Sequence, residues 1–278
     1  MSRLGQLLYT IIDEAGLNQL KVNNRPPLKT QLEKFRDGFI NKRITSEIPL
    51  YDYYHFSWSD TSINFARQKL QNPFKTLKHR WPKTLKPFII FSSITPTIQS
   101  NGFFNQFGNF IDVKRDISLP SSWISREKSG PYLILVSAVI GKEDSLEFRD
   151  AFAMPILSTQ ELIPLESGYE RSVLKTTIGS LKSTGRSNLT IKKPLFCLHN
   201  EQKERYRPDF IISDDKGHSI FVEVLGSRNE DYLDQKWKIS KIAKENCNFY
   251  LSVRGYELHK EHPHFIKVLT QAISQFPK

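Results

Sequence analysis

Two apolar segments, each interrupted by a single carboxylate, constrain the fold of this chain more than any other feature. Residues 208–213 contain Asp209 ahead of an apolar run, and residues 218–225 contain Glu223 within one. The sequence Asp-Asp-Lys-Gly at 214–217 has the composition of a hairpin turn. A carboxylate in an apolar strand is costly to bury unless a cation pairs with it. We therefore expect an antiparallel hairpin that brings Asp209 and Glu223 to one edge of a sheet.

Convergence of these two carboxylates predicts a site for a divalent cation. Carboxylate oxygens and a backbone carbonyl, here that of Val224, form the oxygen-rich ligand set that Mg²⁺ or Mn²⁺ prefers. An ion held in this way can polarise a phosphodiester and activate water for attack on it. The residue pattern thus indicates a metal site suited to phosphodiester chemistry.

The elements around this hairpin follow a regular order after residue 165. Their apolar periodicity predicts helices at 167–179, 229–246 and 263–275, and strands at 194–200, 208–213, 218–225 and 247–253. The order helix, three strands, helix, strand, helix indicates an α/β fold with a mixed sheet in the C-terminal half.

The N-terminal half has a different character. Helical spacing predicts helices at 5–20 and 28–44, short strands fit 88–92 and 103–113, and 120–131 has the composition of a loop. The apolar, β-branched run at 132–140 predicts a buried strand. We expect an α+β basic accessory domain over residues 1–130 and a second domain, carrying the carboxylates, over residues 131–278.

The Pro208-Asp209 pair, the spacing of 14 residues to Glu223 and the flanking apolar strands resemble the PD-(D/E)xK nuclease superfamily, over about residues 165–255. The resemblance implies a restriction-endonuclease-like core and metal-dependent hydrolysis of DNA, with Mg²⁺ or Mn²⁺ as cofactor. It also suggests the nucleases that cleave transposon ends, which pair this fold with an extra domain.

The chain departs from the superfamily pattern two residues after the second acid, where Leu225 replaces the usual lysine. The resemblance implies a branch in which this lysine lies on the following helix, with a pattern like Tyr-x-x-x-Lys. Tyr232 and Lys236 match that pattern, and at 100° per residue Lys236 lies on the half-apolar face, whereas Lys238 and Lys241 point away. A lysine there can orient the attacking water. The alternative is a lysine whose stem packs while its ammonium stays in water.

The superfamily also carries an acid on the helix before the first core strand. Glu170 is our first candidate for this third carboxylate, and Glu166 is the second. Ser167 and Glu170 also spell a capping box, which explains Glu170 without any catalytic role. We therefore expect Glu170, Asp209, Glu223 and Lys236 to be catalytic, and Asp209, Glu223, Val224 and Glu170 to bind the metal.

Positive charge is concentrated in the first part of the chain. The net charge is +11, and no acidic residue lies between Asp60 and Asp112. Basic residues interleaved with aromatic ones suit a nucleic-acid backbone, although a solvated basic face fits as well and a membrane surface fits less well. The candidate nucleic-acid contacts are Arg67, Lys69, Lys75, Lys78, Arg80, Lys83, Lys86 and Arg207. For Arg207, a plain ion pair is the alternative.

Other features narrow the class of protein. Two cysteines without zinc-type spacing and no signal-like or membrane-spanning run predict a cytoplasmic protein. No Walker motif, GxGxxG or GxSxG is present. We expect a DNA endonuclease of a mobile-element, defence or recombination system, acting as a homodimer or with a protein partner that recognises the target. The alternative, kept open by Leu225, is an inactive DNA-binding or assembly protein with the same fold.

Overall fold

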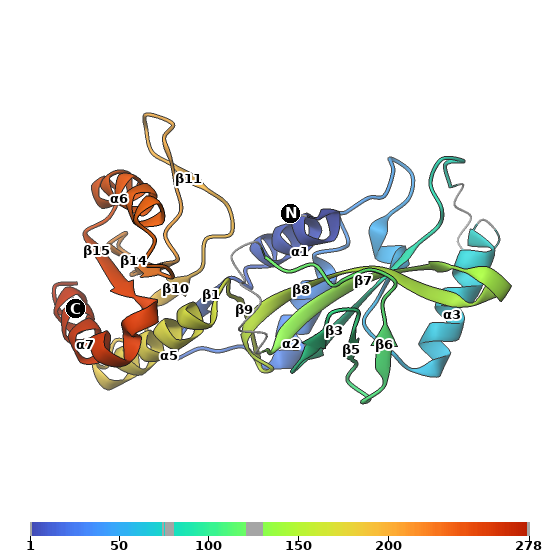
Figure 1. Ribbon diagram of the computed structural model, residues 1–278, viewed down its shortest axis with the longest axis horizontal. Helices are drawn as coiled ribbons and strands as arrows, with labels where there is room; N and C mark the ends of the chain where they lie inside the picture. The colour runs from blue at the N-terminus through green and yellow to red at the C-terminus, as the bar shows by residue number, and fades with distance from the viewer. Residues whose placement is uncertain (1, 74, 76–80, 121–129, 277–278) are drawn as a thin grey trace. The chain divides into compact units, whose positions relative to one another are not determined.

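The computed structural model describes residues 2–73, 75, 81–120 and 130–276 (Figure 1). The chain divides into two compact units. Unit 1 comprises Met1–Leu17 and Pro27–Leu162, and unit 2 comprises Asn18–Pro26 and Ile163–Lys278. Over the described residues, every helix is too short or too polar to cross a membrane.

Unit 1 is built on a five-stranded sheet in the order β2-β3-β7-β8-β9. Its strands are β2 (Tyr54–His55), β3 (Ile89–Thr95), β7 (Tyr132–Ile140), β8 (Leu146–Ser158) and β9 (Glu161–Pro164). A smaller sheet contains β4 (Ile98–Gln99), β5 (Gly102–Phe104) and β6 (Phe110–Asp112). Among the described residues of unit 1, the helices with given bounds are α1 (Arg3–Glu14), α2 (Leu28–Asp37) and α3 (Asp60–Gln71), with the 3₁₀ turns η1 (Leu50–Tyr53) and η2 (Lys142–Asp144).

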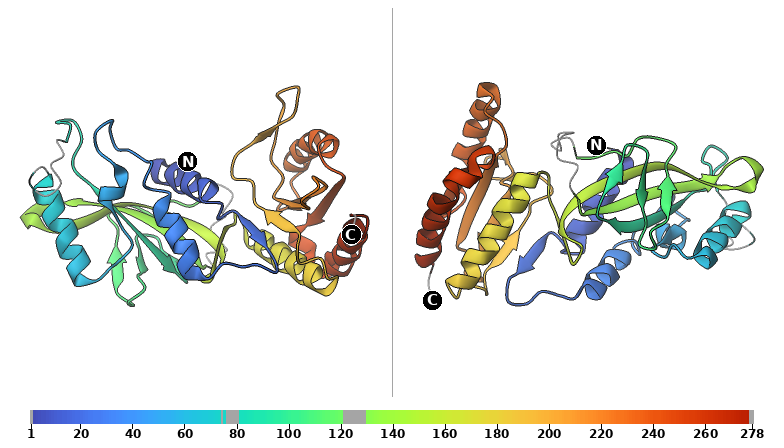
Figure 2. Two further views of the ribbon diagram at one scale, coloured as in Figure 1. Left: turned by 180° about the vertical axis from the view of Figure 1, so that it is seen from behind. Right: turned by 60° about the horizontal axis from the view of Figure 1, so that its bottom comes forward.

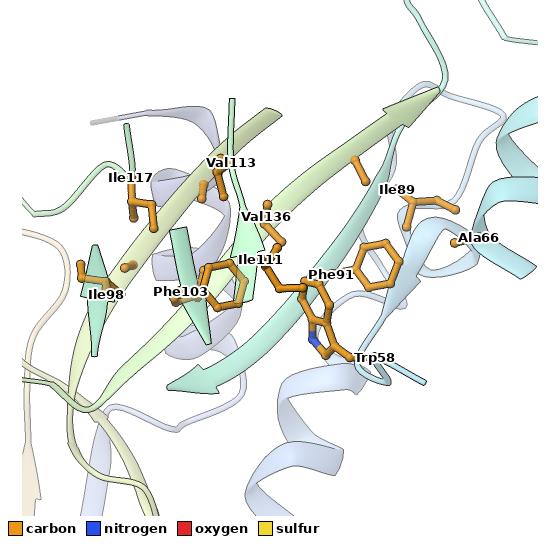
Figure 3. Close-up of a cluster of buried hydrophobic side chains, with 14 of the residues drawn as sticks. Trp58, Ala66, Ile89, Phe91, Ile98, Phe103, Ile111, Val113, Ile117 and Val136 are labelled. Carbon is orange, nitrogen blue, oxygen red and sulfur yellow. The ribbon is translucent and has the colours of Figure 1, made fainter. Parts of the chain in front are cut away.

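The core of unit 1 lies between these two sheets and α3 (Figure 3). The buried strand predicted at 132–140 is confirmed with the same bounds, because most of its side chains are buried on both faces. Trp58 stacks at a tilt on Phe91, 4.9 Å between ring centroids, and meets Phe103 edge-on at 5.6 Å. Its buried indole N–H donates to the Ser92 carbonyl at 2.8 Å, so this large side chain is buried without an unpaired donor.

The division into units differs from the boundary expected between residues 130 and 131. Strands β7 and β8 pair with β3 and with each other in the sheet of unit 1. Sheet pairing therefore places residues 132–158 with the N-terminal half, although their apolar composition resembles that of the later strands. The predicted loop at 120–131 lies mostly outside the described residues.

Unit 2 contains a five-stranded mixed sheet in the order β1-β10-β13-β14-β15. Its strands are β1 (Gln19–Lys21), β10 (Thr190–Lys192), β13 (Phe210–Ser213), β14 (Ser219–Leu225) and β15 (Phe249–Arg254). Its helices are α5 (Gly168–Ser183), α6 (Glu230–Glu245) and α7 (Leu258–Ser274), and Gly255–Glu257 forms the 3₁₀ turn η3. Strands β13 and β14 are antiparallel, whereas β14 and β15 are parallel with α6 between them in the chain.

Helix α6 lies on one side of this sheet, and α5 and α7 lie on the other (Figures 1 and 2). Side chains alternate along β14, so Phe221 and Glu223 face α6 while Val222 and Val224 face α5 and α7. Phe221 packs with Tyr206 and with Ala243 of α6. The α/β fold class with a mixed sheet, predicted for the C-terminal half, is confirmed.

The first core strand is not where the sequence suggested it. The prediction of a strand at 194–200 is wrong for the five-stranded sheet. The strand that pairs with β13 there is β10, which ends at Lys192. Proline lacks the N–H that a ladder needs, and Pro194 follows β10 closely. The apolar run after it leaves Phe196 exposed, and only β11 (Leu198–His199) forms there, pairing with β12 (Arg205–Tyr206).

The predicted helix at 5–20 ends early, and its end supplies an edge strand. Helix α1 stops at Glu14, and Gly16 follows with a φ of 64°, a left-handed conformation that commonly ends helices. The chain then enters β1, which pairs antiparallel with β10. A segment expected in a helix of the accessory region therefore completes the sheet of unit 2.

Candidate functional site

The hairpin of β13 and β14 places Asp209 and Glu223 side by side. Phe210 pairs with Val222, so the preceding Asp209 lies opposite the following Glu223, on the same face of the sheet. Both are buried, with 7% and 2% of their surface exposed. The Val224 N–H donates to Asp209 Oδ2 at 2.7 Å and fixes this carboxylate against β14. The pairing expected from the sequence is therefore present.

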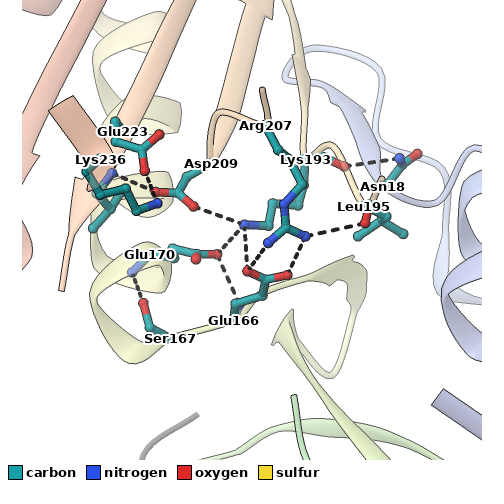
Figure 4. Close-up of polar contacts among 11 residues, drawn as sticks. Asn18, Glu166, Ser167, Glu170, Lys193, Leu195, Arg207, Asp209, Glu223 and Lys236 are labelled. Carbon is teal, nitrogen blue, oxygen red and sulfur yellow. Dashed lines mark hydrogen bonds and ion pairs between the residues drawn. The ribbon is translucent and has the colours of Figure 1, made fainter. Parts of the chain in front are cut away.

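Glu170 joins this site from the first turn of α5 (Figure 4). Ser167 caps the helix, and its Oγ accepts from the Glu170 N–H at 3.1 Å. In a capping box the glutamate would bond back to the Ser167 N–H. Here Glu170 Oε2 accepts from the Glu166 N–H at 3.0 Å and lies 2.9 Å from Lys193 Nζ. Helix capping therefore does not fully account for this buried carboxylate.

Lys236 reaches the site from α6. Its ammonium forms an ion pair with Glu223 Oε1, and the Tyr232 ring lies 5.8 Å from its Nζ. Tyr232 is fixed in turn, because its hydroxyl accepts from the Gly226 N–H at 3.2 Å. Lys238 and Lys241 of the same helix are exposed. Helical periodicity thus singled out the lysine that meets the second acid.

Lys193 lies at the centre of the acidic group, although it was not predicted to belong to the site. Only 1% of this residue is exposed, and its Nζ lies 2.9 Å from Glu170, 3.5 Å from Asp209 and 3.9 Å from Glu166. Ile191 is buried two residues earlier, and residues two apart share a strand face. This alternation could have predicted that Lys193 is buried beside Ile191. The apolar run after Pro194, however, favoured a strand later in the chain.

Arg207 lies at the rim of this group and is bound to Glu166. Its two terminal nitrogens donate to the two Glu166 carboxylate oxygens at 2.8 and 2.9 Å, and one also reaches the Leu195 carbonyl at 3.3 Å. A bidentate pair of this kind is geometrically specific. The ion pair given as the alternative for Arg207 is therefore present, and Glu166 is engaged in holding it.

Burial dominates the electrostatics of the acids. It raises the pKa of Glu223 to about 8, and the adjacent Asp209 adds to the shift while Lys236 opposes it. Burial likewise raises the pKa of Glu170 to about 7, against the opposing charge of Lys193. Burial opposes the charge of Lys236, yet Asp209 and Glu223 raise its pKa to about 12. The two glutamates are thus incompletely neutralised by the cations of the chain.

The donor set fits a hard divalent cation. Carboxylate oxygens of Glu166, Glu170 and Asp209 all lie within 4.8 Å of one another. Glu223 lies opposite Asp209, and burial followed by the charge of Asp209 raises its pKa although Lys236 is close by. All these donors are oxygens, the ligands that Mg²⁺ and Mn²⁺ prefer.

Two family models match the chain. Residues 1–156 match the model described as a domain of unknown function, DUF8535, which covers more than half of the sequence. The chain belongs to this family. Residues 166–266 of this DUF8535 protein match the model described as a restriction endonuclease-like C-terminal domain. That range contains Glu166, Glu170, Asp209, Glu223 and Lys236. No curated protein and no solved structure matches the chain.

The candidate nucleic-acid contacts of the DUF8535 protein fall into different environments. Arg67, Lys75, Lys83 and Lys86 are exposed in unit 1. Lys69 is 7% exposed, and its Nζ donates to the Asp52 carbonyl at 2.8 Å, so its ammonium is used internally. Burial lowers its pKa. Lys78 and Arg80 lie outside the described residues.

Proposed function

We propose that this protein is a metal-dependent endonuclease that hydrolyses phosphodiester bonds in DNA. One observation carries the proposal: Lys236 of α6 forms an ion pair with Glu223, in a domain that matches a restriction endonuclease-like family model. Lys236 thus supplies the cation that the superfamily usually takes from the position of Leu225. Asp209 lies directly opposite that glutamate. Asp209 and Glu223 thus provide metal ligands, and Lys236 provides a cation for the reacting phosphate at the same place.

Asp209, Glu223 and Glu170 are the residues that would hold Mg²⁺ or Mn²⁺, with the Val224 carbonyl as a further ligand. A bound ion of this type polarises the phosphodiester and lowers the pKa of the attacking water. The geometry supports this assignment, because carboxylate oxygens of Glu170 and Asp209 lie within 4.8 Å of each other and Glu223 lies opposite Asp209.

The residues of the chain perform the remaining tasks. Lys236 orients the attacking water and offsets the negative charge that develops on the phosphate. The Val224 N–H holds Asp209 in a fixed orientation at 2.7 Å. Glu166 restrains Arg207 through two hydrogen bonds at the rim of the site. Preorganised charges of this kind need little rearrangement during the reaction.

DNA as the substrate rests on analogy with the superfamily and on the exposed basic residues of unit 1. We propose that these residues bind the phosphate backbone without reading its sequence. Recognition of the target would come from a protein partner or a second copy of the chain. A cytoplasmic transposition, defence or recombination system would fit a nuclease whose target is recognised by another protein chain.

Cleavage of supercoiled plasmid by the purified chain, with Mg²⁺ or Mn²⁺, tests the proposal. Wild type should cleave, and Asp209→Asn should lose cleavage while retaining DNA binding. Asp234→Asn, which changes an exposed carboxylate on α6, is the matched control and should cleave normally. Parallel reactions with single-stranded DNA and RNA define the class of substrate.

An inactive scaffold gives the opposite pattern. Wild type would then bind DNA but cleave nothing with either ion, alone or with candidate partners. Asp209→Asn would raise stability, because it relieves carboxylate repulsion without affecting any reaction. That result would contradict the endonuclease proposal and favour a DNA-binding or assembly role.

A further inference from the structure

Lys193 is a fully buried ammonium group placed where several carboxylates need positive charge. Its Nζ is shared between Glu170 at 2.9 Å and Asp209 at 3.5 Å, and Glu166 lies slightly farther away (Figure 4). Its Nζ also lies 5.5 Å from the centroid of the Phe210 ring. A lysine buried to this extent is rare unless it is paired. These contacts explain how it remains charged.

The backbone of Lys193 is held from both sides by a single residue. Its N–H donates to the Asn18 carbonyl at 2.7 Å, and its own carbonyl accepts from the Asn18 side-chain amide at 3.1 Å. Asn18 itself is 1% exposed and directly precedes β1. The ammonium therefore projects from a fixed backbone, so it cannot easily withdraw from the acids.

The Lys193 ammonium brings the charge of the site close to neutrality. The group contains three cations, Lys193, Arg207 and Lys236, and four carboxylates. The four carboxylates are Glu166, Glu170, Asp209 and Glu223. When all of these groups are charged the sum is −1, so one divalent ion and one phosphodiester together bring it to zero. A second divalent ion would add two more positive charges, and the Lys193 ammonium opposes this addition because it already lies 2.9 Å from Glu170 and 3.5 Å from Asp209.

We propose that the Lys193 ammonium takes the place of a second metal ion, so that the site binds one divalent cation rather than two. In this role Lys193 is a positioning residue, since it acts through Glu170 and Asp209. It keeps the acidic group folded before metal arrives. The inference rests on the proposed metal-dependent function and specifies how many ions that function uses.

Counting bound Mn²⁺ by electron paramagnetic resonance on the full chain, after treatment with a chelator, tests the proposal. Wild type should bind one ion. Lys192→Met is the matched control, because Lys192 is the exposed neighbour on β10, and it should also bind one. Lys193→Met should bind two ions, because it removes one positive charge and frees the Glu170 and Asp209 oxygens that the ammonium now contacts. Its metal-free melting temperature should fall by roughly 10 °C, and Mn²⁺ should raise it more than in wild type.

A second variant keeps the proposal testable if Lys193→Met does not fold in the absence of metal. Lys193→Met combined with Glu170→Gln removes one cation and its nearest anion together, so the charge balance is restored. This double variant should regain most of the lost melting temperature. If Lys193→Met does not fold without metal and the double variant does, the proposal is supported. If neither variant folds, the proposal is overturned.

The possible ion counts separate this inference from the proposed function. Two ions in wild type, or only one in Lys193→Met, would overturn the role of Lys193 as a substitute for a metal ion but leave metal dependence intact. Wild type that binds no Mn²⁺ would contradict the metal-dependent function itself.

Discussion

The Lys236 ammonium forms an ion pair with the Glu223 carboxylate, although one residue lies on α6 and the other on β14. This contact places a cation next to the second acid, where Leu225 leaves none on the strand. Replacing Lys236 with methionine should lower the rate of plasmid cleavage by about 100-fold or more, since a charge aimed at the transition state is removed. Binding of DNA and of Mn²⁺ should be retained.

Lys238→Met is the control for this prediction, because Lys238 lies on the same helix and is exposed. It should cleave at the wild-type rate. Equal cleavage by both variants would mean that Lys236 only packs its stem against the domain, which is the alternative for this residue.

The pKa of Glu223 predicts how stability depends on pH. Burial raises it from 4.5 in the unfolded chain to about 8 in the folded one, so the folded state binds more protons across this range. The metal-free protein should therefore lose stability as the pH rises from about 5 to 8. Melting temperatures in the presence of a chelator measure this slope. Glu223→Gln should make the slope shallower and leave the part that comes from Glu170, whose pKa is also raised, and a slope of opposite sign in wild type would contradict the raised pKa.

Parts of the site that depend on local patterns could be predicted from the sequence. The turn at 214–217 sets the register of the hairpin, and the register alone puts Asp209 opposite Glu223. Lys236 followed from helical periodicity within α6. In both cases a short segment with strong periodicity determines where the side chain points.

Parts that depend on distant segments could not be predicted. Lys193 is held by Asn18, which lies 175 residues earlier in the sequence. β1 joins the sheet only because α1 ends at Glu14, and β10 has three residues, too few for a clear pattern. A longer apolar run after Pro194 was the stronger signal and proved misleading. Tertiary pairing outweighed local propensity at these places.

The ion pair between Arg207 and Glu166 predicts a structural role for an arginine that the sequence suggested as a phosphate contact. Arg207→Met should lower the free energy of unfolding by on the order of 2–3 kcal/mol, since it removes the two hydrogen bonds that Arg207 donates to a largely buried carboxylate. The salt dependence of DNA binding should not change. Adding Glu166→Gln should recover part of the lost stability. Unchanged stability with a salt slope reduced by about 1 would indicate a phosphate contact instead.

The exposed basic residues of unit 1 predict the electrostatic part of DNA binding. Replacing Lys75, Lys83 and Lys86 together with glutamine should weaken binding to all sequences alike. The slope of log K against log salt concentration should fall by about 0.9 for each phosphate that the variant no longer neutralises. Lys69→Met is the control: it should lower stability and leave the slope unchanged, because the Lys69 ammonium is bound to the Asp52 carbonyl. A triple variant with the wild-type slope would show that these lysines form only a solvated basic face.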